Sequence, residues 1–182
     1  IEVRHEQVLG QNLWIEDLRS QHDAVFLGMG LTGVNALGID SEVMDGVQNA
    51  VDFIAELRQS ESLETLPVGR RVVVIGGGNT AIDAAVQSKL LGAQSVHMVY
   101  RRGPQSMSAS TAEQEWAQTH GVVLHHWLAP VDILGREGFV TGVRFAEQAV
   151  VDGTLQPTGR ETTLEADTVL KAIGQKLGNP VL

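Results

Sequence analysis

Three small residues at a fixed spacing follow a run of β-branched side chains. Gly76, Gly78 and Ala81 form the pattern Gly-x-Gly-x-x-Ala directly after the run from Arg71 to Ile75. In such a pattern the first glycine permits a tight turn, the second lets the backbone approach a ligand, and the third small residue lets a helix pack closely on the strand. The pattern predicts dinucleotide binding, although glycine turns also arise for packing alone.

The helix expected after this turn supplies charge for anion binding. Its first N–H groups lack intrahelical partners, and its dipole places positive charge at that end. A diphosphate is therefore expected there, and Asn79 or Thr80 is able to cap the helix or to contact the anion. Gly77 lies in the same turn and belongs to the predicted binding loop.

Two arginines occupy the position that distinguishes the pyridine dinucleotides. When NAD is the ligand, an acidic residue about 20 positions onward binds the ribose 2′-hydroxyl. This sequence has Tyr100, Arg101 and Arg102 in that neighbourhood. Guanidinium groups hold a 2′-phosphate by charge-assisted forked hydrogen bonds, which a carboxylate cannot form. The pair therefore favours NADP(H), and the alternative is a solvated strand end in an acidic protein.

The elements around these residues predict half of a mononucleotide-binding fold. The run from Arg71 to Ile75 suits a central parallel strand, and a helix is expected from residue 79 to 91. Residues 95–100 give the next strand, which completes a right-handed βαβ crossover of about 30 residues. After a helix at 110–119, residues 122–124 give a third parallel strand.

Short segments separated by glycines follow Pro130 and predict an antiparallel meander. They lie at residues 131–134, 139–145 and 161–164. The predicted fold class is α/β, a Rossmann-like three-layer nucleotide-binding domain with a central parallel sheet and an antiparallel β-meander, plus short segments of an adjoining domain.

Two similar segments flank this domain. Residues 23–30 and 167–174 each run from an aspartate through mostly apolar residues to a glycine, which is typical of buried strands. We expect them to form a two-strand hinge. Residues 1–5 alternate like a strand, and residues 13–19 carry apolar side chains at helical spacing.

Composition excludes several classes of function. A formal net charge of -9 argues against a nucleic-acid surface, which needs a basic face. With no cysteine, the chain has no disulfide, redox dithiol or thiolate-ligated iron–sulfur cluster, so redox chemistry needs a borrowed cofactor. No apolar run approaches the roughly 20 residues of a spanning helix, and no leader opens the chain. We expect a cytoplasmic protein without membrane contacts, and the ends look like those of an excised piece.

Histidines and tryptophans give no further site. His125 and His126 are adjacent, so on a strand they point to opposite faces and cannot chelate one metal together. Trp14, Trp116 and Trp127 are scattered and are assigned to core packing. The sequence predicts no metal site and no catalytic acid or base.

Three segments resemble one known family. They are Val-Ile-Gly-Gly-Gly-Asn-Thr-Ala-Ile-Asp at 74–83, Val-Tyr-Arg-Arg at 99–102 and Lys-Ala-Ile-Gly-Gln at 171–175. They resemble the glutamate synthase small-subunit family, to which bacterial dihydropyrimidine dehydrogenase flavin subunits belong, and the resemblance covers nearly the whole chain. Many members have Met-Pro where this chain has Met107-Ser108, which is more similar to the dihydropyrimidine branch.

The resemblance implies a set of cofactor-binding residues. Those that would contact the nucleotide are Gly76, Gly77, Gly78, Asn79, Thr80, Ala81, Arg101 and Arg102. Ala172, Ile173 and Gly174 would lie towards the nicotinamide and the flavin.

The resemblance also implies a domain arrangement. Residues 1–30 would be the last part of a first FAD-domain segment with a hinge strand, residues 31–166 the NAD(P)H-binding domain, and residues 167–182 the return strand into the FAD domain. The family's FAD fingerprint and cysteine-rich cluster domain have no counterpart here. FAD would be bound mainly by sequence outside this segment, and iron–sulfur clusters would belong to the full-length protein or a partner.

The sequence therefore predicts the NAD(P)H-binding domain of an FAD-dependent oxidoreductase, which passes hydride from NADPH or NADH to FAD. Bacterial dihydropyrimidine enzymes are associated with NADH, so the prediction does not choose between the two nucleotides. The expected partners are the FAD domain of the same polypeptide and a catalytic partner subunit, and the isolated segment is expected to be inactive. One alternative is a non-catalytic dinucleotide-sensing module, since a fold does not fix a function. Another is a transferase for a different adenine-containing ligand, against which the paired arginines argue.

Overall fold

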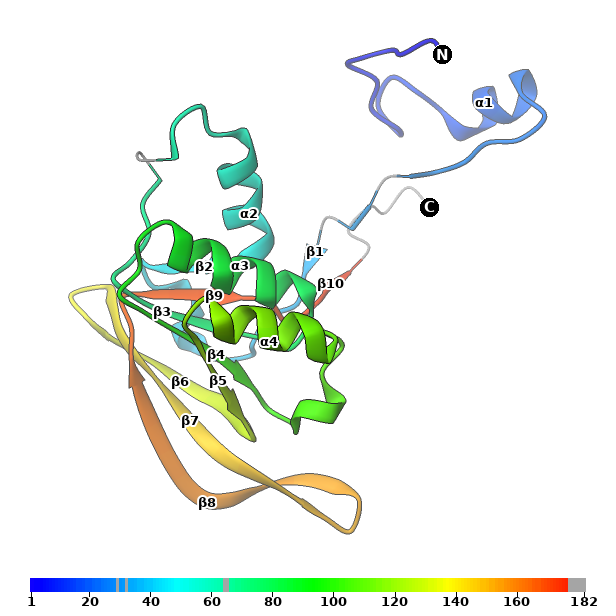
Figure 1. Cartoon of the computed structure of the whole chain (residues 1–182). Coiled ribbons are helices and arrows are strands. Elements are labelled where there is room, and N and C mark those ends of the chain that lie inside the picture. Colours follow the sequence, from blue (N-terminus) through cyan, green and yellow to red (C-terminus); the bar gives the residue numbers. More distant parts are fainter. Residues whose placement is uncertain (29, 32, 64–65, 177–182) are drawn as a thin grey trace. The chain divides into compact units, whose positions relative to one another are not determined.

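The computed structural model describes residues 1–28, 30–31, 33–63 and 66–176. Its contacts divide the chain into two units, one made of Ile1–Gly33 with Gln175–Leu182 and the other of Val34–Gly174. The larger unit contains a parallel sheet, three helices and an antiparallel sheet (Figure 1). Within the described part of the chain, no helix is long and apolar enough to cross a membrane.

A five-stranded parallel sheet forms the centre of the larger unit and confirms the predicted fold class. Its strands, in spatial order, are β2 (Val47–Asn49), β9 (Thr168–Lys171), β3 (Arg71–Ile75), β4 (Ser95–Tyr100) and β5 (Val122–His126). The three valines of β3 are fully buried, as expected for a parallel strand covered on both faces. The register places Ile75 beside Val99 of β4 and Lys171 of β9, so these strands end at one edge of the sheet.

Three helices cover one face of this sheet (Figure 1). They are α2 (Ala50–Gln59), α3 (Asn79–Leu90) and α4 (Thr111–Thr119). α3 connects β3 to β4 and confirms the predicted βαβ crossover. Ala81 and Ala85 of α3 are fully buried, which shows why small residues let this helix lie close to the sheet. Gly92 follows the helix with φ +103°, the left-handed conformation that ends it.

The predicted meander covers the opposite face. It consists of β6 (Leu128–Arg136), β7 (Phe139–Val151) and β8 (Thr154–Glu165), paired antiparallel. Phe145 and Ile133 of this meander pack in one cluster with Val73 and Ile75, whereas the alternate side chains of β3 face the helices. The β7–β8 turn has φ +51° at Asp152 and +74° at its glycine, which matches a two-residue type I′ hairpin.

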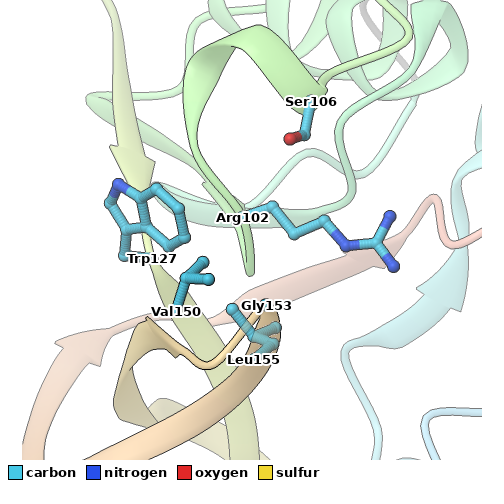
Figure 2. Close-up of a pocket in the computed structure, with 6 residues that line it drawn as sticks. All are labelled: Arg102, Ser106, Trp127, Val150, Gly153 and Leu155. Carbon is cyan, nitrogen blue, oxygen red and sulfur yellow. The ribbon is translucent and has the colours of Figure 1, made fainter.

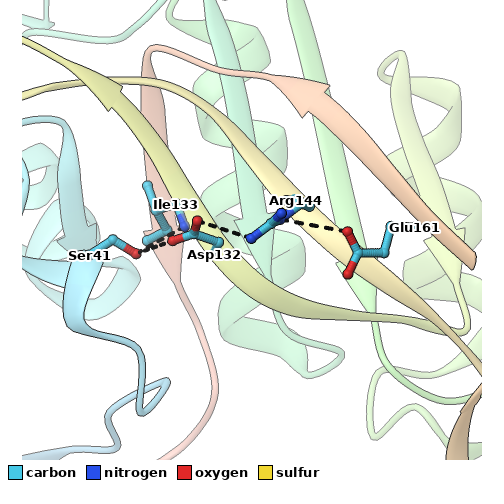
Figure 3. Close-up of polar contacts among 5 residues, drawn as sticks. All are labelled: Ser41, Asp132, Ile133, Arg144 and Glu161. Carbon is cyan, nitrogen blue, oxygen red and sulfur yellow. Dashed lines mark hydrogen bonds and ion pairs between the residues drawn. The ribbon is translucent and has the colours of Figure 1, made fainter. Parts of the chain in front are cut away.

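A polar network ties the segment before β2 to the meander (Figure 3). Ser41 lies on η1 (Asp40–Val43), where its hydroxyl donates to Asp132 at 2.9 Å and accepts from the Ile133 N–H at 3.0 Å. Arg144 donates to the other Asp132 oxygen at 3.2 Å and forms an ion pair with Glu161 at 3.7 Å. Each partly exposed ion pair contributes no more than about 1 kcal/mol, so the network mainly orients η1.

The smaller unit differs from the sequence expectation. α1 (Ile15–Gln21) forms close to the predicted helix, but the strand predicted at residues 1–5 is absent. The strand predicted at 23–30 is also wrong for residues 23–28 and 30, where the backbone is irregular and Phe26 is 94% exposed. Met29 lies outside the described residues. A strand needs partners for its backbone N–H and C=O groups, and no described segment of this chain pairs with residues 23–28.

The second half of the predicted hinge is part of the central sheet. β9 pairs with β3 and β2, so it belongs with the larger unit, beyond the domain boundary expected at residue 166. A separate two-stranded sheet does form, from β1 (Gly33–Val34) and β10 (Gln175–Lys176). The remaining residues assigned to the return strand, 177–182, lie outside the described residues.

Candidate functional site

The first glycine of the fingerprint is required by the fold itself. Gly76 has φ +155°, a conformation that other residues rarely adopt. A Cβ atom at this position would collide with the carbonyl oxygen of Ala172. The Ala172 N–H donates to Ile75 at 2.8 Å, and the Gly76 N–H donates to Val99 at 3.0 Å. Gly76 therefore lets the chain leave β3 between its two neighbouring strands.

Gly77, which lies between the two glycines of the fingerprint, is closed in by a tyrosine that sequence reasoning did not single out. Gly77 is buried, and a Cβ there would collide with the ring of Tyr100. The Tyr100 hydroxyl donates to the backbone oxygen of Ser106 at 2.7 Å. Tyr100 thus links the glycine turn to the loop after β4. Its position immediately before the two arginines was the only signal available in the sequence.

Gly78, the second glycine of the fingerprint, is open. Gly78 has φ -108° and ψ 179°, an ordinary extended conformation, and a Cβ there would meet only the Ser108 hydroxyl, at 3.0 Å. It is the N-cap of α3, so the expectation that Asn79 or Thr80 caps this helix is wrong, because both lie inside its first turn. The backbone N–H groups of Gly78, Asn79 and Thr80 find no acceptor among the described residues. The start of α3 therefore offers unpaired donors next to open space, which is the arrangement that binds a phosphate.

The paired arginines lie at the end of the neighbouring strand. Arg101 and Arg102 directly follow β4, and both are exposed. Neither guanidinium forms a hydrogen bond or an ion pair with the described residues, although the chain has 22 acidic residues against 13 basic ones. Both groups are therefore free to bind an external anion.

The residues expected near the nicotinamide lie on the other side of the glycine turn. Ala172 follows β9 and contacts Gly76 as described above. Ile173 packs against the meander-side cluster, and Gly174 has φ +95°. The backbone of Asn35 donates to the Gly174 carbonyl at 3.2 Å, and its side chain donates to the Ile173 carbonyl at 3.3 Å. These contacts fix the chain that leaves β9.

A largely buried ion pair next to this segment was missed by sequence reasoning. Lys171 Nζ lies 2.9 Å from Glu42 Oε2, and the two side chains are 14% and 12% exposed. Burial alone would raise the pKa of Glu42, but hydrogen bonds from the N–H groups of Leu37 and Gly38 and the Lys171 ammonium lower it to about 2. A lysine within the otherwise apolar run of β9 was the available signal. The pair joins η1 to the end of β9, and the hydrogen bonds from Leu37 and Gly38 to Glu42 hold the loop before η1 in the same cluster.

An open pocket of about 360 Å³ lies beside the second arginine (Figure 2). Its lining residues are Arg102, Ser106, Trp127, Val150, Gly153 and Leu155. Trp127 follows β5, so the pocket lies at the same sheet edge as the glycine turn. The sequence had assigned Trp127 to the core.

The adjacent histidines have separate partners. His125 Nε2 lies 2.8 Å from Nδ1 of His97 on the neighbouring strand, and His126 lies 3.4 Å from the sulfur of Met107. Burial lowers the pKa of His97 and of His126. Burial also lowers the pKa of His125, with smaller contributions from the charges of the two other histidines. In the described ranges, no group of three or more His, Cys, Asp or Glu side chains is arranged to hold a metal.

The sheet edge and its glycine turn are those of a Rossmann-like fold, and comparison with known proteins identifies the family. Residues 3–181 match the family described as pyridine nucleotide-disulphide oxidoreductase, and the chain belongs to this family.

Named relatives confirm the resemblance to glutamate synthase small subunits. The chain is 32% identical over 191 residues to the glutamate synthase (NADPH) small chain of Escherichia coli, covering 96% of this chain and 40% of that protein. It is 31% identical over 186 residues to the NADPH-Fe(3+) oxidoreductase subunit beta of Geobacter sulfurreducens, covering 96% of this chain and 27% of that protein. The chain thus spans between about a quarter and two fifths of these relatives.

Solved structures show the same fold. FprA from Mycobacterium tuberculosis matches with a TM-score of 0.71 at 22% identity, over 93% of this chain and 53% of that chain. The thioredoxin reductase of T. acidophilum matches with a TM-score of 0.57 at 22% identity, over 80% of this chain and 42% of that chain.

Proposed function

We propose that this chain is the NAD(P)H-binding domain of a flavoprotein oxidoreductase, in which hydride passes from NADPH or NADH to FAD for onward electron transfer. The observation that supports this most is the order of features along one sheet edge. Ala172, the glycine turn and the paired arginines follow β9, β3 and β4, which are neighbours in the sheet. Ligands of open α/β sheets bind at the carboxyl ends of the strands, where the strand order reverses. Here that reversal lies between β3 and β9.

The residues at this edge fit a dinucleotide in extended form. The unpaired N–H groups of Gly78, Asn79 and Thr80 would hold the diphosphate. Arg101 and Arg102 would hold a 2′-phosphate on the adenosine side. Small Ala172 and the fixed backbone of Gly174 would leave room for the nicotinamide on the other side.

The nicotinamide supplies the hydride when it is bound, so this chain's residues only bind and orient it. No side chain here needs to donate or remove a proton. The two arginines favour NADPH over NADH, and the names of the relatives from Escherichia coli and Geobacter sulfurreducens both include NADPH.

The flavin and the final acceptor are assigned to sequence beyond this chain, since it spans at most about two fifths of those relatives. We assign the smaller unit to the FAD domain of the same polypeptide. Its exposed apolar side chains, which include Trp14, Phe26 and Leu31 at 48%, 94% and 49%, favour burial against further protein. The full-length protein would be of the glutamate synthase small-subunit or dihydropyrimidine dehydrogenase type. Iron–sulfur clusters would lie in other domains or a partner subunit, and the location would be the cytoplasm.

Calorimetric titration of the chain with NADPH and with FAD tests the proposal. We expect the chain to bind NADPH, to contain no stoichiometric FAD and to lack diaphorase activity. Stoichiometric FAD in the purified chain would contradict the assignment of the flavin to other sequence. In the full-length protein, NADPH should reduce the flavin. Binding without flavin reduction would instead indicate a dinucleotide-sensing module.

A further inference from the structure

Trp127, which lines the pocket beside Arg102, has a strained backbone. Trp127 has φ +62°, which is uncommon for any residue with a side chain and unusual for a bulky one. Such conformations cost about 1–3 kcal/mol and persist where the surroundings fix them, often at ligand sites. At Trp127 both backbone groups are held, because its N–H donates to Arg102 at 3.2 Å and its carbonyl accepts from Gln148 at 2.7 Å.

These two hydrogen bonds join three segments that are far apart in sequence. Trp127 is thereby fixed between the arginine loop and β7, and its indole ring packs closely over Gly103, where a Cβ would come within 2.6 Å of the ring. Val150 and Leu155 lie opposite each other across the β7–β8 hairpin and extend the apolar wall. Val150 is 57% exposed, so the hairpin tip leaves apolar surface beside an aromatic ring.

The polar lining residues of this pocket, Arg102 and Ser106, lie on a different side from its apolar wall. The guanidinium end of Arg102 points away from Trp127, and the Ser106 hydroxyl lies at the rim (Figure 2). A volume of about 360 Å³ is at the low end of the range of roughly 300–1,000 Å³ for small-molecule sites. It suits a planar ring system better than a whole dinucleotide.

We propose that Trp127 and the tip of the β7–β8 hairpin form the subsite for the purine base of the bound nucleotide. This inference rests on the proposed function, in which Arg101 and Arg102 hold the 2′-phosphate. The base and the 2′-phosphate are attached to adjacent carbons of one ribose, so the base must lie within a few bonds of these guanidiniums. The apolar and aromatic wall of this pocket is the surface next to Arg102 on which a base stacks, and Trp127 thereby contributes to recognition of the adenosine half.

The test uses adenosine 2′,5′-bisphosphate, which has the base and both phosphates but no nicotinamide. Calorimetric titrations at one ionic strength compare the chain with Trp127→Ala, Val150→Trp and Val151→Trp. Stacking of a base on an aromatic side chain is worth about 5- to 150-fold in affinity, so Trp127→Ala should weaken binding by that factor. Val150→Trp should weaken it because the larger ring fills the pocket, whereas the neighbouring Val151 lies on the other face of the strand and its substitution should have no effect.

Each result decides the inference. Loss in Trp127→Ala and Val150→Trp, with Val151→Trp unchanged, supports it. If Trp127→Ala does not fold, Val150→Trp at the exposed hairpin tip decides alone. Unchanged affinity in the pocket variants, together with loss in an Arg101→Ala/Arg102→Ala variant, overturns the base subsite and leaves the proposed function intact. If the unmodified chain binds neither this probe nor NADPH, the proposed function falls, and the inference falls with it.

Discussion

The glycine turn contains glycines in two different environments. Gly76 and Gly77 are closed in by their own chain, the first against Ala172 and the second against Tyr100. Gly78 has an unstrained backbone and meets only a serine hydroxyl. The comparison separates glycines that the fold requires from a glycine whose absent side chain leaves space for a ligand.

Replacement of the first glycine should have the largest effect. Gly76→Val would place a branched side chain on a backbone with φ +155° and against the Ala172 carbonyl. Strain and overpacking together should cost about 4 kcal/mol or more, a large share of a domain's total stability. Chemical denaturation followed by circular dichroism should show a much lower midpoint or no folded state. A midpoint close to that of the unmodified chain would show that the turn tolerates other conformations.

Replacement of the open glycine should separate binding from folding. Gly78→Val fits its extended backbone, and the Ser108 side chain can move, so the expected loss of stability is below about 1 kcal/mol. The valine would occupy the space that the diphosphate approaches, so NADPH affinity should fall by more than about 100-fold, roughly 2.7 kcal/mol. Calorimetry and thermal melting on one sample measure both quantities. Retained binding would place the diphosphate elsewhere.

Sequence patterns predicted the elements whose partners lie within the chain. The β3–α3–β4 unit and the meander were confirmed because alternating burial and glycine turns are local signals. Residues 23–28 have the same apolar pattern as β9, yet among the described residues only β9 has neighbouring strands. An apolar run gives no information on whether a pairing strand is available, and this limits prediction from sequence.

For the candidate site as well, the sequence indicated only the residues that belong to local motifs. The glycine turn and the arginines are contiguous motifs that the sequence itself displays, whereas the contact between Ala172 and Gly76 joins segments far apart in the sequence. The role of Tyr100, the Glu42–Lys171 pair and the pocket beside Trp127 depend on contacts between distant segments. No local pattern encodes such contacts.

Replacement of both arginines should weaken the binding of one nucleotide more than that of the other. A hydrogen bond to a charged group contributes about 1.5–3 kcal/mol, so Arg101→Ala/Arg102→Ala should weaken NADPH binding by about 10- to 150-fold. NADH lacks the 2′-phosphate and should lose less. The measurement is a pair of isotherms at one ionic strength, because salt weakens exposed ion pairs.

A charge-matched control separates a local effect from a change in net charge. Arg136→Ala/Arg160→Ala removes two exposed arginines of the meander, outside the proposed site. Its affinity for both nucleotides should equal that of the unmodified chain. Equal losses of NADPH and NADH in the Arg101/Arg102 variant would mean that these residues bind the diphosphate or support the fold.

The smallest expected effect is on stability and concerns the Glu42–Lys171 pair at the end of β9. The folded-state pKa of Glu42 is lowered from 4.5 to about 2, so its contribution to stability is present above pH 4.5 and is lost as the pH falls towards 2. Between pH 5 and pH 3.5 the unfolded state takes up the proton first, which should remove about 1 kcal/mol of stability. Glu42→Gln cannot titrate, so its stability should fall less over this interval than that of the unmodified chain. Denaturation curves of both proteins at the two pH values give the difference, in which the other titrating groups cancel. Parallel curves would show that Glu42 has an ordinary pKa and that the loop before η1 is held to β9 by packing and backbone contacts alone.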